Sequence, residues 1–203
     1  MDSAISTNPI DWTFETARVR ARLVDERDRE LYRALYTDPA VMAHIGSTMD
    51  DVGVDALLQK ISRCNTGSTN RARYWRLSQN SSNHAIGQLS AIFAADDSTI
   101  VELGLMLLPA NQGQGIGNEV SIRILDLLMG NHWGLNVSTV IAQHAGSNFR
   151  VSRLGMMLGF EHRGRQEDAM EAWRLTKSDW LASRSHFDQQ VPSNIYPIGG
   201  SRI

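Results

Sequence analysis

The residues with the clearest capacity for chemistry form a glycine-rich loop, Q-G-Q-G-I-G, at positions 112–117. An apolar run over residues 101–108 precedes the loop and a segment with helical apolar spacing follows it, which predicts a strand, a loop and a helix. Glycines let several backbone N–H groups converge, and a helix start adds unpaired donors and a positive dipole end. We therefore expect the loop to bind a phosphate or pyrophosphate.

Two common phosphate-binding loops are excluded by spacing. A nucleotide P-loop ends in Gly-Lys-Ser/Thr, whereas Gly117 is followed by Asn118 and Glu119. The dinucleotide fingerprint G-x-G-x-x-G requires a third glycine where this chain has Asn118 or Val120. We therefore expect a different ligand that contains phosphate.

The pattern that remains, Gln112-x-x-Gly115-x-Gly117 behind a strand ending in L-L-P, resembles motif A of the GNAT acetyltransferase superfamily. The wider run E-L-G-L-M-L-L-P-A-N-Q-G-Q-G-I-G, with T-A-R-V-R-A-R-L-V near the start, resembles the ribosomal-protein alanine N-acetyltransferase (RimJ/RimL-like) branch. In the superfamily this loop holds the pyrophosphate of acetyl-CoA, and we expect no metal. The resemblance implies that acetyl-CoA is held by Gln112, Gly113, Gln114, Gly115, Ile116, Gly117 and Asn118.

The resemblance implies two further contacts with acetyl-CoA. The central strand of the family is bulged so that its backbone amides face the thioester and the pantetheine arm, and these amides map to Leu105, Met106 and Leu107. Asn148, eleven residues before Gly159, stands where enzymes of this type carry an asparagine that contacts the pantetheine arm. The alternative role for Asn148 is a plain helix N-cap.

Acetyl transfer to an amine requires that the amine lose a proton, because an α-amino group has a pKa of about 7.7–8.0. Glu102 is the candidate base: it is the only ionisable side chain between Val101 and Gln112, and an acid in a buried strand should be paired, neutral or active. It also matches a glutamate of the RimJ/RimL-like pattern. The alternatives are a structural Glu102 that reaches solvent or pairs with an arginine, and His144, after the neighbouring strand, as the base.

The leaving thiolate needs less assistance, because a thiol has a pKa of about 8.5. Many GNAT enzymes nevertheless carry a tyrosine acid seven residues after the asparagine, where this chain has Gly155, and Val151 replaces the RimJ/RimL-like serine. Ser152 lies one helical turn beyond Asn148 on the same face, so we expect it to donate to the sulfur. Ser147 is placed to cap the helix.

The spacing of apolar residues, together with capping aspartates and glycines, predicts the helices and strands that position these residues. Residues 17–24 alternate small or apolar residues with arginine, as in a half-exposed strand whose arginines either face solvent or bind phosphate. Asp25 and Asp38 begin two helices. We also expect helices at 51–64, behind the glycine loop with a left-handed Gly130 at its end, and at 148–158, and strands at 74–77, 86–93, 139–143 and 169–176.

This order predicts a single α/β GNAT domain whose mixed central sheet has an antiparallel N-terminal half and flanking helices. The helix after the glycine loop returns the chain, so strand 139–143 runs parallel to the central strand, and a splay between the two leaves room for a ligand's arm. We expect a leader over residues 1–15, anchored by Trp12 and Phe14, the GNAT domain over 16–180, and an irregular tail over 181–203.

Composition limits the partners and the cellular location that we expect. The net charge of -2 and pI near 6.3 favour neither nucleic acid nor an anionic membrane as partner. Cys64 is the only cysteine, which excludes an intrachain disulfide and favours a reducing compartment. The N-terminus lacks a signal pattern and no run approaches the roughly 18 apolar residues of a membrane helix, so we expect a cytoplasmic protein.

The sequence therefore predicts an acetyl-CoA-dependent N-acetyltransferase that acts on a primary amine, either a protein N-terminus or a small-molecule amine. The missing acid motivates an alternative, a non-catalytic acyl-CoA-binding regulatory or interaction protein. The oligomeric state is left open, with a homodimer as one option.

Overall fold

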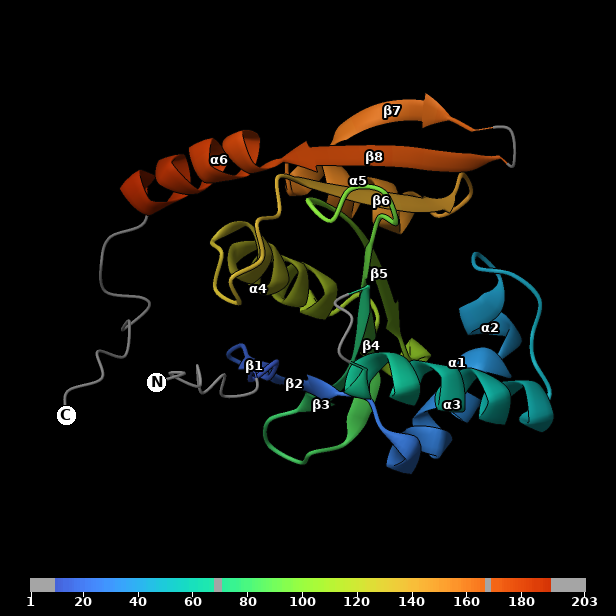
Figure 1. Cartoon of the computed structure of the whole chain (residues 1–203). Helices are drawn as coiled ribbons and strands as arrows, with labels where there is room; N and C mark the ends of the chain where they lie inside the picture. Colours follow the sequence, from blue (N-terminus) through green and yellow to red (C-terminus); the bar gives the residue numbers. More distant parts are fainter. Residues whose placement is uncertain (1–9, 68–70, 167–168, 191–203) are drawn as a thin grey trace, which may run out of the picture.

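The computed structural model describes residues 10–67, 71–166 and 169–190. In chain order its elements are β1 (Phe14–Glu15), β2 (Val19–Leu23), η1 (Glu26–Asp28), α1 (Arg29–Tyr36), α2 (Pro39–Met42), α3 (Asp51–Thr66), β3 (Ala72–Gln79), β4 (Ala85–Phe93), β5 (Ile100–Leu107), η2 (Pro109–Asn111), α4 (Ile116–Met129), β6 (Thr139–Ala145), α5 (Phe149–Met157), β7 (Glu161–Arg165), β8 (Met170–Thr176) and α6 (Lys177–Gln190). The strands form one eight-stranded sheet in the order β1-β2-β3-β4-β5-β6-β8-β7. Only β5 and β6 run parallel, so the predicted mixed α/β sheet is confirmed (Figure 1).

The sheet separates two groups of helices (Figure 1). We call the side covered by α1, α2 and α3 the α3 face, and the side covered by α4 and α5 the α4 face. Successive residues of a strand point to opposite faces. Along β5, Leu103 and Leu105 accordingly pack into the main core with Ile124 of α4, whereas Met106 packs with Leu35 of α1.

Aspartates begin the first three helical segments, as expected for side chains that satisfy the free N–H groups of a first turn. Asp25 accepts from the backbone N–H of Arg27 and starts η1, which leads directly into α1. Asp38 accepts from the N–H of Ala40 at the start of α2, and Asp50 caps α3. The predicted starts at Asp25 and Asp38 are thus confirmed.

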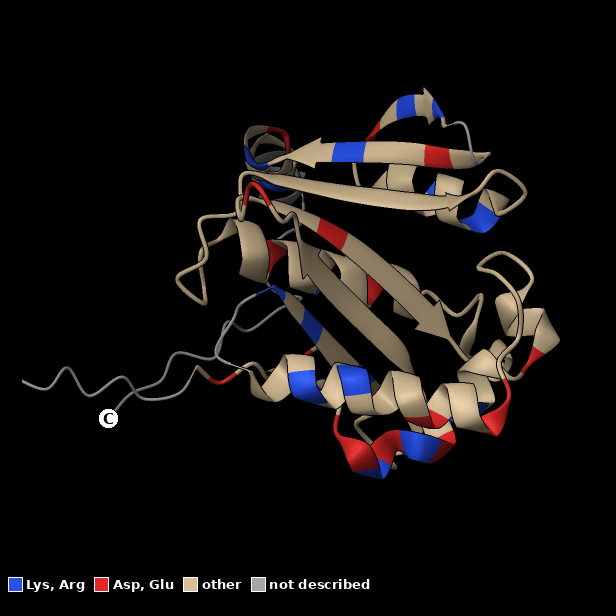
Figure 2. Cartoon of the chain, turned by 45° about the vertical axis from the view of Figure 1, so that its right-hand side comes forward, with Lys and Arg blue, Asp and Glu red and all other residues tan. Residues whose placement is uncertain are grey.

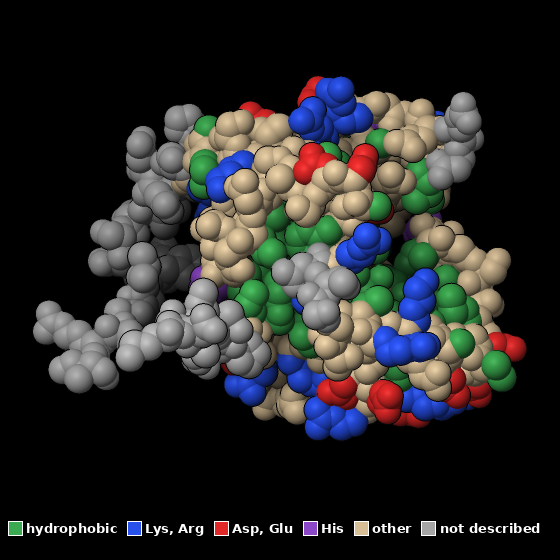
Figure 3. All heavy atoms as spheres, viewed as in Figure 1, with side chains coloured by type: hydrophobic (Ala, Val, Ile, Leu, Met, Phe, Trp, Pro, Cys, Tyr) green, Lys and Arg blue, Asp and Glu red, His purple; other side chains and the backbone are tan. Residues whose placement is uncertain are grey.

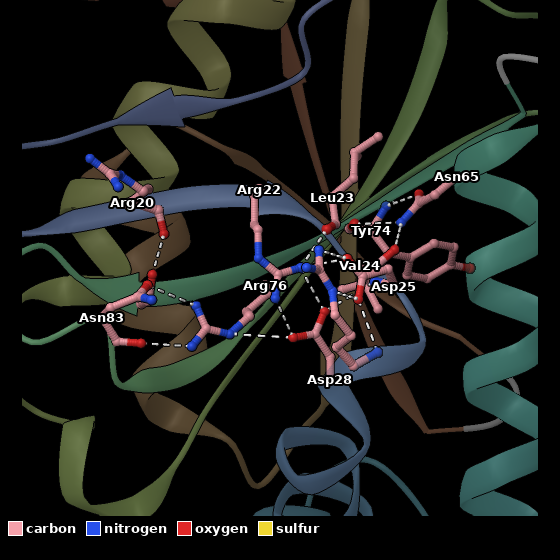
Figure 4. Close-up of polar contacts among 12 residues, drawn as sticks. Arg20, Arg22, Leu23, Val24, Asp25, Asp28, Asn65, Tyr74, Arg76 and Asn83 are labelled. Atoms are coloured by element: carbon pink, nitrogen blue, oxygen red, sulfur yellow. Dashed lines mark hydrogen bonds and ion pairs between the residues drawn. The ribbon is translucent and has the colours of Figure 1, made fainter.

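A buried carboxylate ties α1 to the sheet. Asp28 is only 4% exposed and accepts from both terminal nitrogens of Arg22, at 2.6 and 2.9 Å, while Arg76 Nε lies 3.4 Å away (Figure 4). The two arginines are directly opposite each other on β2 and β3. A buried charge is tolerated when it is paired and hydrogen-bonded, so this cluster fixes α1 on the α3 face.

Asn65 fixes the end of α3 in the same way. Its side-chain amide donates to the carbonyls of Val24 and Tyr74, both at 2.9 Å, and its oxygen accepts from the backbone N–H of Tyr74 at 3.0 Å (Figure 4). These bonds join the end of α3 to β3 at Tyr74.

The parallel strands separate after a short pairing. β5 and β6 pair over three residues only, ending at Glu102 opposite Ile141, although both strands continue beyond this point. The predicted splay is therefore confirmed. The bulge implied by the resemblance is not found, because β4 and β5 pair over seven residues without a register shift. The gap arises because β6 diverges.

Three expectations about the second half of the chain need correction. The tail was expected to be irregular, but α6 continues to Gln190, anchored by a buried Trp180 that donates to Asp126; residues 191–203 lie outside the described residues. Strand β7 was not expected, because the exposed edge sequence E-H-R-G-R lacks apolar alternation. Gly130 has φ -76 and is not left-handed; a Cβ there would clash with the Asp126 carbonyl oxygen.

The expected leader contributes to the core where the structure describes it. Trp12 and Phe14 are 8% and 4% exposed and pack with Trp75 and Trp133, and Phe14 belongs to β1. Both predicted anchors are therefore buried. Residues 1–9 lie outside the described residues.

Candidate active site

The glycine loop turns through two left-handed residues, Gly113 at φ +74° and Gly115 at φ +77°. Only glycine adopts this region readily, which explains the residue type at both positions. Gly115 is the N-cap residue of α4, and no side-chain cap bonds to this helix start. The N–H groups of the first turn therefore remain available for an anion.

Arg18, the residue immediately before β2, holds the loop from outside. Its Nη1 donates to the carbonyl of Gln114 at 2.9 Å. The C=O and N–H of a trans peptide point in opposite directions, so this bond turns the N–H of Gly115 away from Arg18. The arginine also lies against the loop at its sharpest point, since a Cβ on Gly115 would be 3.6 Å from Arg18 Nη2.

The same arginine neutralises Glu119, an acid in the first turn of α4. Arg18 Nε donates to Glu119 Oε2 at 2.6 Å, and its backbone N–H donates to Oε1 at 2.9 Å. Partial burial raises the pKa of Glu119, but hydrogen bonds from Thr16 and Arg18 outweigh burial and hold the pKa below its usual range. Glu119 is therefore ionised and paired, which reduces its repulsion of an anion at the helix start.

The side chain of Gln112 joins the loop to its neighbours. Its Nε2 donates to the carbonyl of Leu107 at 3.0 Å, and its Oε1 accepts from Arg150 Nη1 of α5 at 3.4 Å. Arg18 and Arg150, from segments far apart in sequence, thus border the loop on two sides. Sequence reasoning left Arg18 among three equivalent strand arginines and missed Arg150, because neither contact is local.

The other predicted loop residues have mixed environments. Ile116 is 4% exposed and belongs to the main core, so its side chain is structural. The Gln114 side chain donates to the carbonyl four residues earlier at 2.6 Å. Gly117 faces Leu105, and Asn118 is half-buried in the first turn of α4. The side chains at these four positions therefore have no common environment, and only their backbone belongs to one loop.

The end of β5 lies between the loop and the gap. In a strand, successive N–H groups point to alternate edges, so those of Leu105, Met106 and Leu107 that do not bond to β4 face the gap toward β6. The bond from Gln112 to Leu107 brings this edge beside the glycine loop. The structure thus brings together the predicted loop and the predicted strand backbone.

Glu102 stands where the strands separate. Its neighbours across the sheet are Ile92 on β4 and Ile141 on β6, and all three side chains point to the α3 face. Within the described part of the chain, its carboxylate forms no hydrogen bond and no ion pair. Tyr74 lies on the same face, where burial, Cys64 and the charge of Glu102, in that order, raise its pKa.

His144 is buried within β6, at 5% exposure, rather than in a loop as expected. Its Nδ1 lies 2.8 Å from the carbonyl of Ala145, so we assign the ring hydrogen to Nδ1. Nε2 therefore accepts from Trp173 Nε1 at 2.9 Å, and Ser152 Oγ lies 3.3 Å from the same nitrogen. The histidine shares the α4 face with Val140, opposite to Glu102.

Helix α5 carries the remaining predicted residues. The side chain of Asn148 accepts from the N–H of Val151 at 3.4 Å, which makes it an N-cap. Ser147, expected to cap the helix, instead lies 3.0 Å from His44 Nδ1. At Gly155 a Cβ would lie 3.3 Å from the ring of Trp173, so the indole packs where a tyrosine side chain would begin.

The fold is an α/β domain in which a glycine loop at a helix start lies beside parallel strands that separate. A family model described as acetyltransferase (GNAT) domain matches residues 18–161, more than half of the chain. The chain therefore belongs to the GNAT acetyltransferase family.

Solved structures agree on the fold. Spermidine N-acetyltransferase from Vibrio cholerae, in complex with CoA and spermine, is 17% identical with a TM-score of 0.68, over 80% of this chain and 98% of that one. Ribosomal-protein-S5-alanine acetyltransferase from Vibrio fischeri is 18% identical with a TM-score of 0.68, over 84% and 99%. A GCN5-related N-acetyltransferase from Brucella melitensis is 15% identical with a TM-score of 0.71, over 96% and 91%. Among curated proteins, no sequence matches this chain.

The described residues contain no group of three or more His, Cys, Asp or Glu side chains that could hold a metal ion. None of the described helices is long and apolar enough to cross a membrane.

Proposed function

We propose that this protein transfers an acetyl group from acetyl-CoA to a primary amine. One observation carries the proposal: the gap between β5 and β6 opens at Glu102, with the anion-binding loop on the α4 side and the free carboxylate on the α3 side. A coenzyme held at the loop and an amine held at the carboxylate would meet across the sheet at this gap.

The residues present fit acetyl-CoA, which supplies the acetyl thioester when bound. A Cβ on Gly113 would meet no atom within 4 Å, so the left-handed turn opens onto free space at the loop. The backbone amides from Gly113 to Asn118 would hold the pyrophosphate, and Asn148 would lie beside the pantetheine arm. Arg18 keeps the loop in shape for this role.

The chain's own groups divide the chemistry between the two faces. Glu102 takes the proton from the amine, directly or through one water, because its carboxylate has no competing partner among the described residues. Backbone N–H groups of Leu105, Met106 and Leu107 that face the gap stabilise negative charge on the acetyl oxygen. His144 is a poor base for the amine, since its Nε2 already accepts from Trp173 and lies on the α4 face.

Ser152 is placed to assist the departing sulfur. Its hydroxyl is on the α4 face, 3.3 Å from His144 Nε2, and Trp173 donates to that nitrogen at the shorter distance of 2.9 Å. The hydroxyl can therefore turn its hydrogen toward the thiolate. A thiolate is a tolerable leaving group, so this help is modest.

The acceptor we propose first is a protein N-terminal amine, by resemblance to the RimJ/RimL-like branch, and second a small-molecule amine. The test is turnover of acetyl-CoA, followed as thiol release, with a panel of peptides, polyamines and alkylamines. We expect acetylation of at least one class. If CoA binds tightly and no amine is acetylated, the protein is a non-catalytic acyl-CoA-binding protein, the reading that Gly155 motivates.

A further inference from the structure

A small hollow lies beside Glu102 on the α3 face. Its volume is about 90 Å³, and it is lined by Ile92, Phe93, Ala94, Ile100, Glu102 and Ile141. Hydrophobic side chains gather on this side of the molecule, between the strands above and α3 below (Figure 3). Five of the six lining residues are apolar, so the hollow offers one charged group in apolar surroundings.

We infer that the acceptor carries its amine on a short aliphatic group of about three to four carbons, with no second positive charge nearby. The inference rests on the proposed function and adds the chemical class of the acceptor. The amine would meet the carboxylate of Glu102, and the aliphatic group would fill the hollow.

The register of the sheet places the charge and the apolar wall together. Ile92, Glu102 and Ile141 are directly opposite one another on β4, β5 and β6. Side chains in such positions lie about 4.5–5.5 Å apart at Cβ. Ile92 is 40% exposed, which is unusual for a large apolar residue inside a sheet and leaves apolar surface for a ligand to cover.

The volume sets the size of the aliphatic group. A cavity of about 150 Å³ accommodates benzene, so about 90 Å³ corresponds by proportion to three or four carbon atoms. Each methylene that enters the hollow should raise kcat/KM roughly fourfold. A phenyl ring exceeds the space and should lose this gain.

The charges around the hollow disfavour a polyamine. Glu102 is the only acidic residue of β4, β5 and β6, seen as the single acidic segment on these strands in Figure 2. Glu102 is opposite Ile141 of β6, and Ile141 is opposite Arg174 of β8, which is the next charged residue in this row across the sheet. The C-terminal half of α3, which borders β3, carries Lys60 and Arg63 and no acid. Two acids, Asp96 and Asp97, lie in the turn between Ala94 and Ile100, but both are exposed and Asp97 accepts two hydrogen bonds from Thr99. Along the row of Glu102 and toward α3, a second ammonium group would therefore face positive charge.

The test compares kcat/KM at saturating acetyl-CoA for peptides that differ only in an N-terminal Gly, Ala, Val or Phe, and for isobutylamine and spermidine. We expect a rise from Gly to Val, a lower value for Phe, and a value for spermidine at least tenfold below that for Val. The peptide and isobutylamine arms separate a protein N-terminus from a free alkylamine.

Two variants of Ile92 sharpen the test. I92A enlarges the hollow and should improve Phe relative to Val, whereas I92D adds a second carboxylate and should improve spermidine relative to Val at least tenfold. I10A is the matched control, because Ile10 is similarly exposed, at 43%, and lies outside the hollow. CoA affinity of each variant reports whether it is folded.

The outcomes separate this inference from the proposed function. Acetylation that favours spermidine, or an order of peptides unaffected by I92A and I92D, overturns the inference alone. Absence of acetylation for every amine overturns the proposed function and the inference with it.

Discussion

The bond from Arg18 to the glycine loop predicts that the residue immediately before β2 controls CoA affinity. In R18Q the carbonyl of Gln114 loses its donor at 2.9 Å, and Glu119 loses the donor at 2.6 Å. The N–H of Gly115 is then no longer held in one direction, and Glu119, in the first turn of α4, keeps its bonds from Thr16 and the backbone N–H of residue 18 but loses its cation. Both changes should weaken binding of the pyrophosphate.

The magnitude follows from the contacts. A hydrogen bond to a charged group contributes about 1.5–3 kcal/mol, and the Arg18 side chain is 50% exposed, which reduces this value. We expect a loss of about 1–1.5 kcal/mol, or roughly tenfold in Kd. E119Q keeps the bond from Arg18 to Gln114 and removes an acid from the helix start, so its Kd should change by less than about threefold, and the two changes should be non-additive.

Calorimetric titration with CoA measures these effects, and R20Q is the matched control. Arg20 lies two residues after Arg18, within β2, and pairs with Glu15; the side chains of Arg20 and Glu15 are both more than half exposed. R20Q removes the same charge without touching the loop, so its Kd should change less than twofold. An equal loss in R18Q and R20Q would show a general charge effect, and an unchanged Kd in a folded R18Q would refute the reasoning.

Three further predictions concern the loop, the acid step and stability. G115E puts a side chain at φ +77° and a carboxylate at the loop, so CoA binding should fall at least ~100-fold by calorimetry while circular dichroism is unchanged. S152A should lower kcat about tenfold and S147A should not; the reverse result would identify the other hydroxyl. The hydrogen bond from Arg27 lowers the pKa of Asp25 to about 2, so its charge stabilises the fold above about pH 4 and this contribution is lost as the pH falls toward 2. D25N should therefore cost ~1 kcal/mol at pH 7 in urea unfolding, allowing for exposure, and almost nothing near pH 2; an equal cost at both pH values would contradict this.

The sequence was informative where structure depends on local pattern. The strand, glycine loop and helix around residues 101–129 follow from an apolar run, three closely spaced glycines and helical spacing. The parallel pairing of β5 and β6 was expected from chain order, since a helix must return the chain between parallel strands, whereas the point of separation at Glu102 is known from the structure alone. Local pattern therefore located the loop and the candidate base.

Contacts between distant segments could not be read in the same way. Arg18 and Gln114 are 96 residues apart, and the alternating strand gives Arg18 no mark that distinguishes it from Arg20. The partners of His144, Trp173 and Ser152, likewise depend on how β8 and α5 pack. The polar edge strand β7 was missed because its residues have no buried face to give a period.

The central claim is that Glu102 deprotonates an amine at the gap between β5 and β6, and E102Q tests it most directly. The measurement is kcat for an accepted amine across pH at saturating acetyl-CoA, with the acetylated product identified by mass and the Kd of CoA measured in parallel. We expect kcat to fall roughly 10²–10⁴-fold, the acidic limb of the pH–rate profile to disappear, and the Kd to stay unchanged. Full activity in a folded E102Q, with the acidic limb intact, would contradict the account.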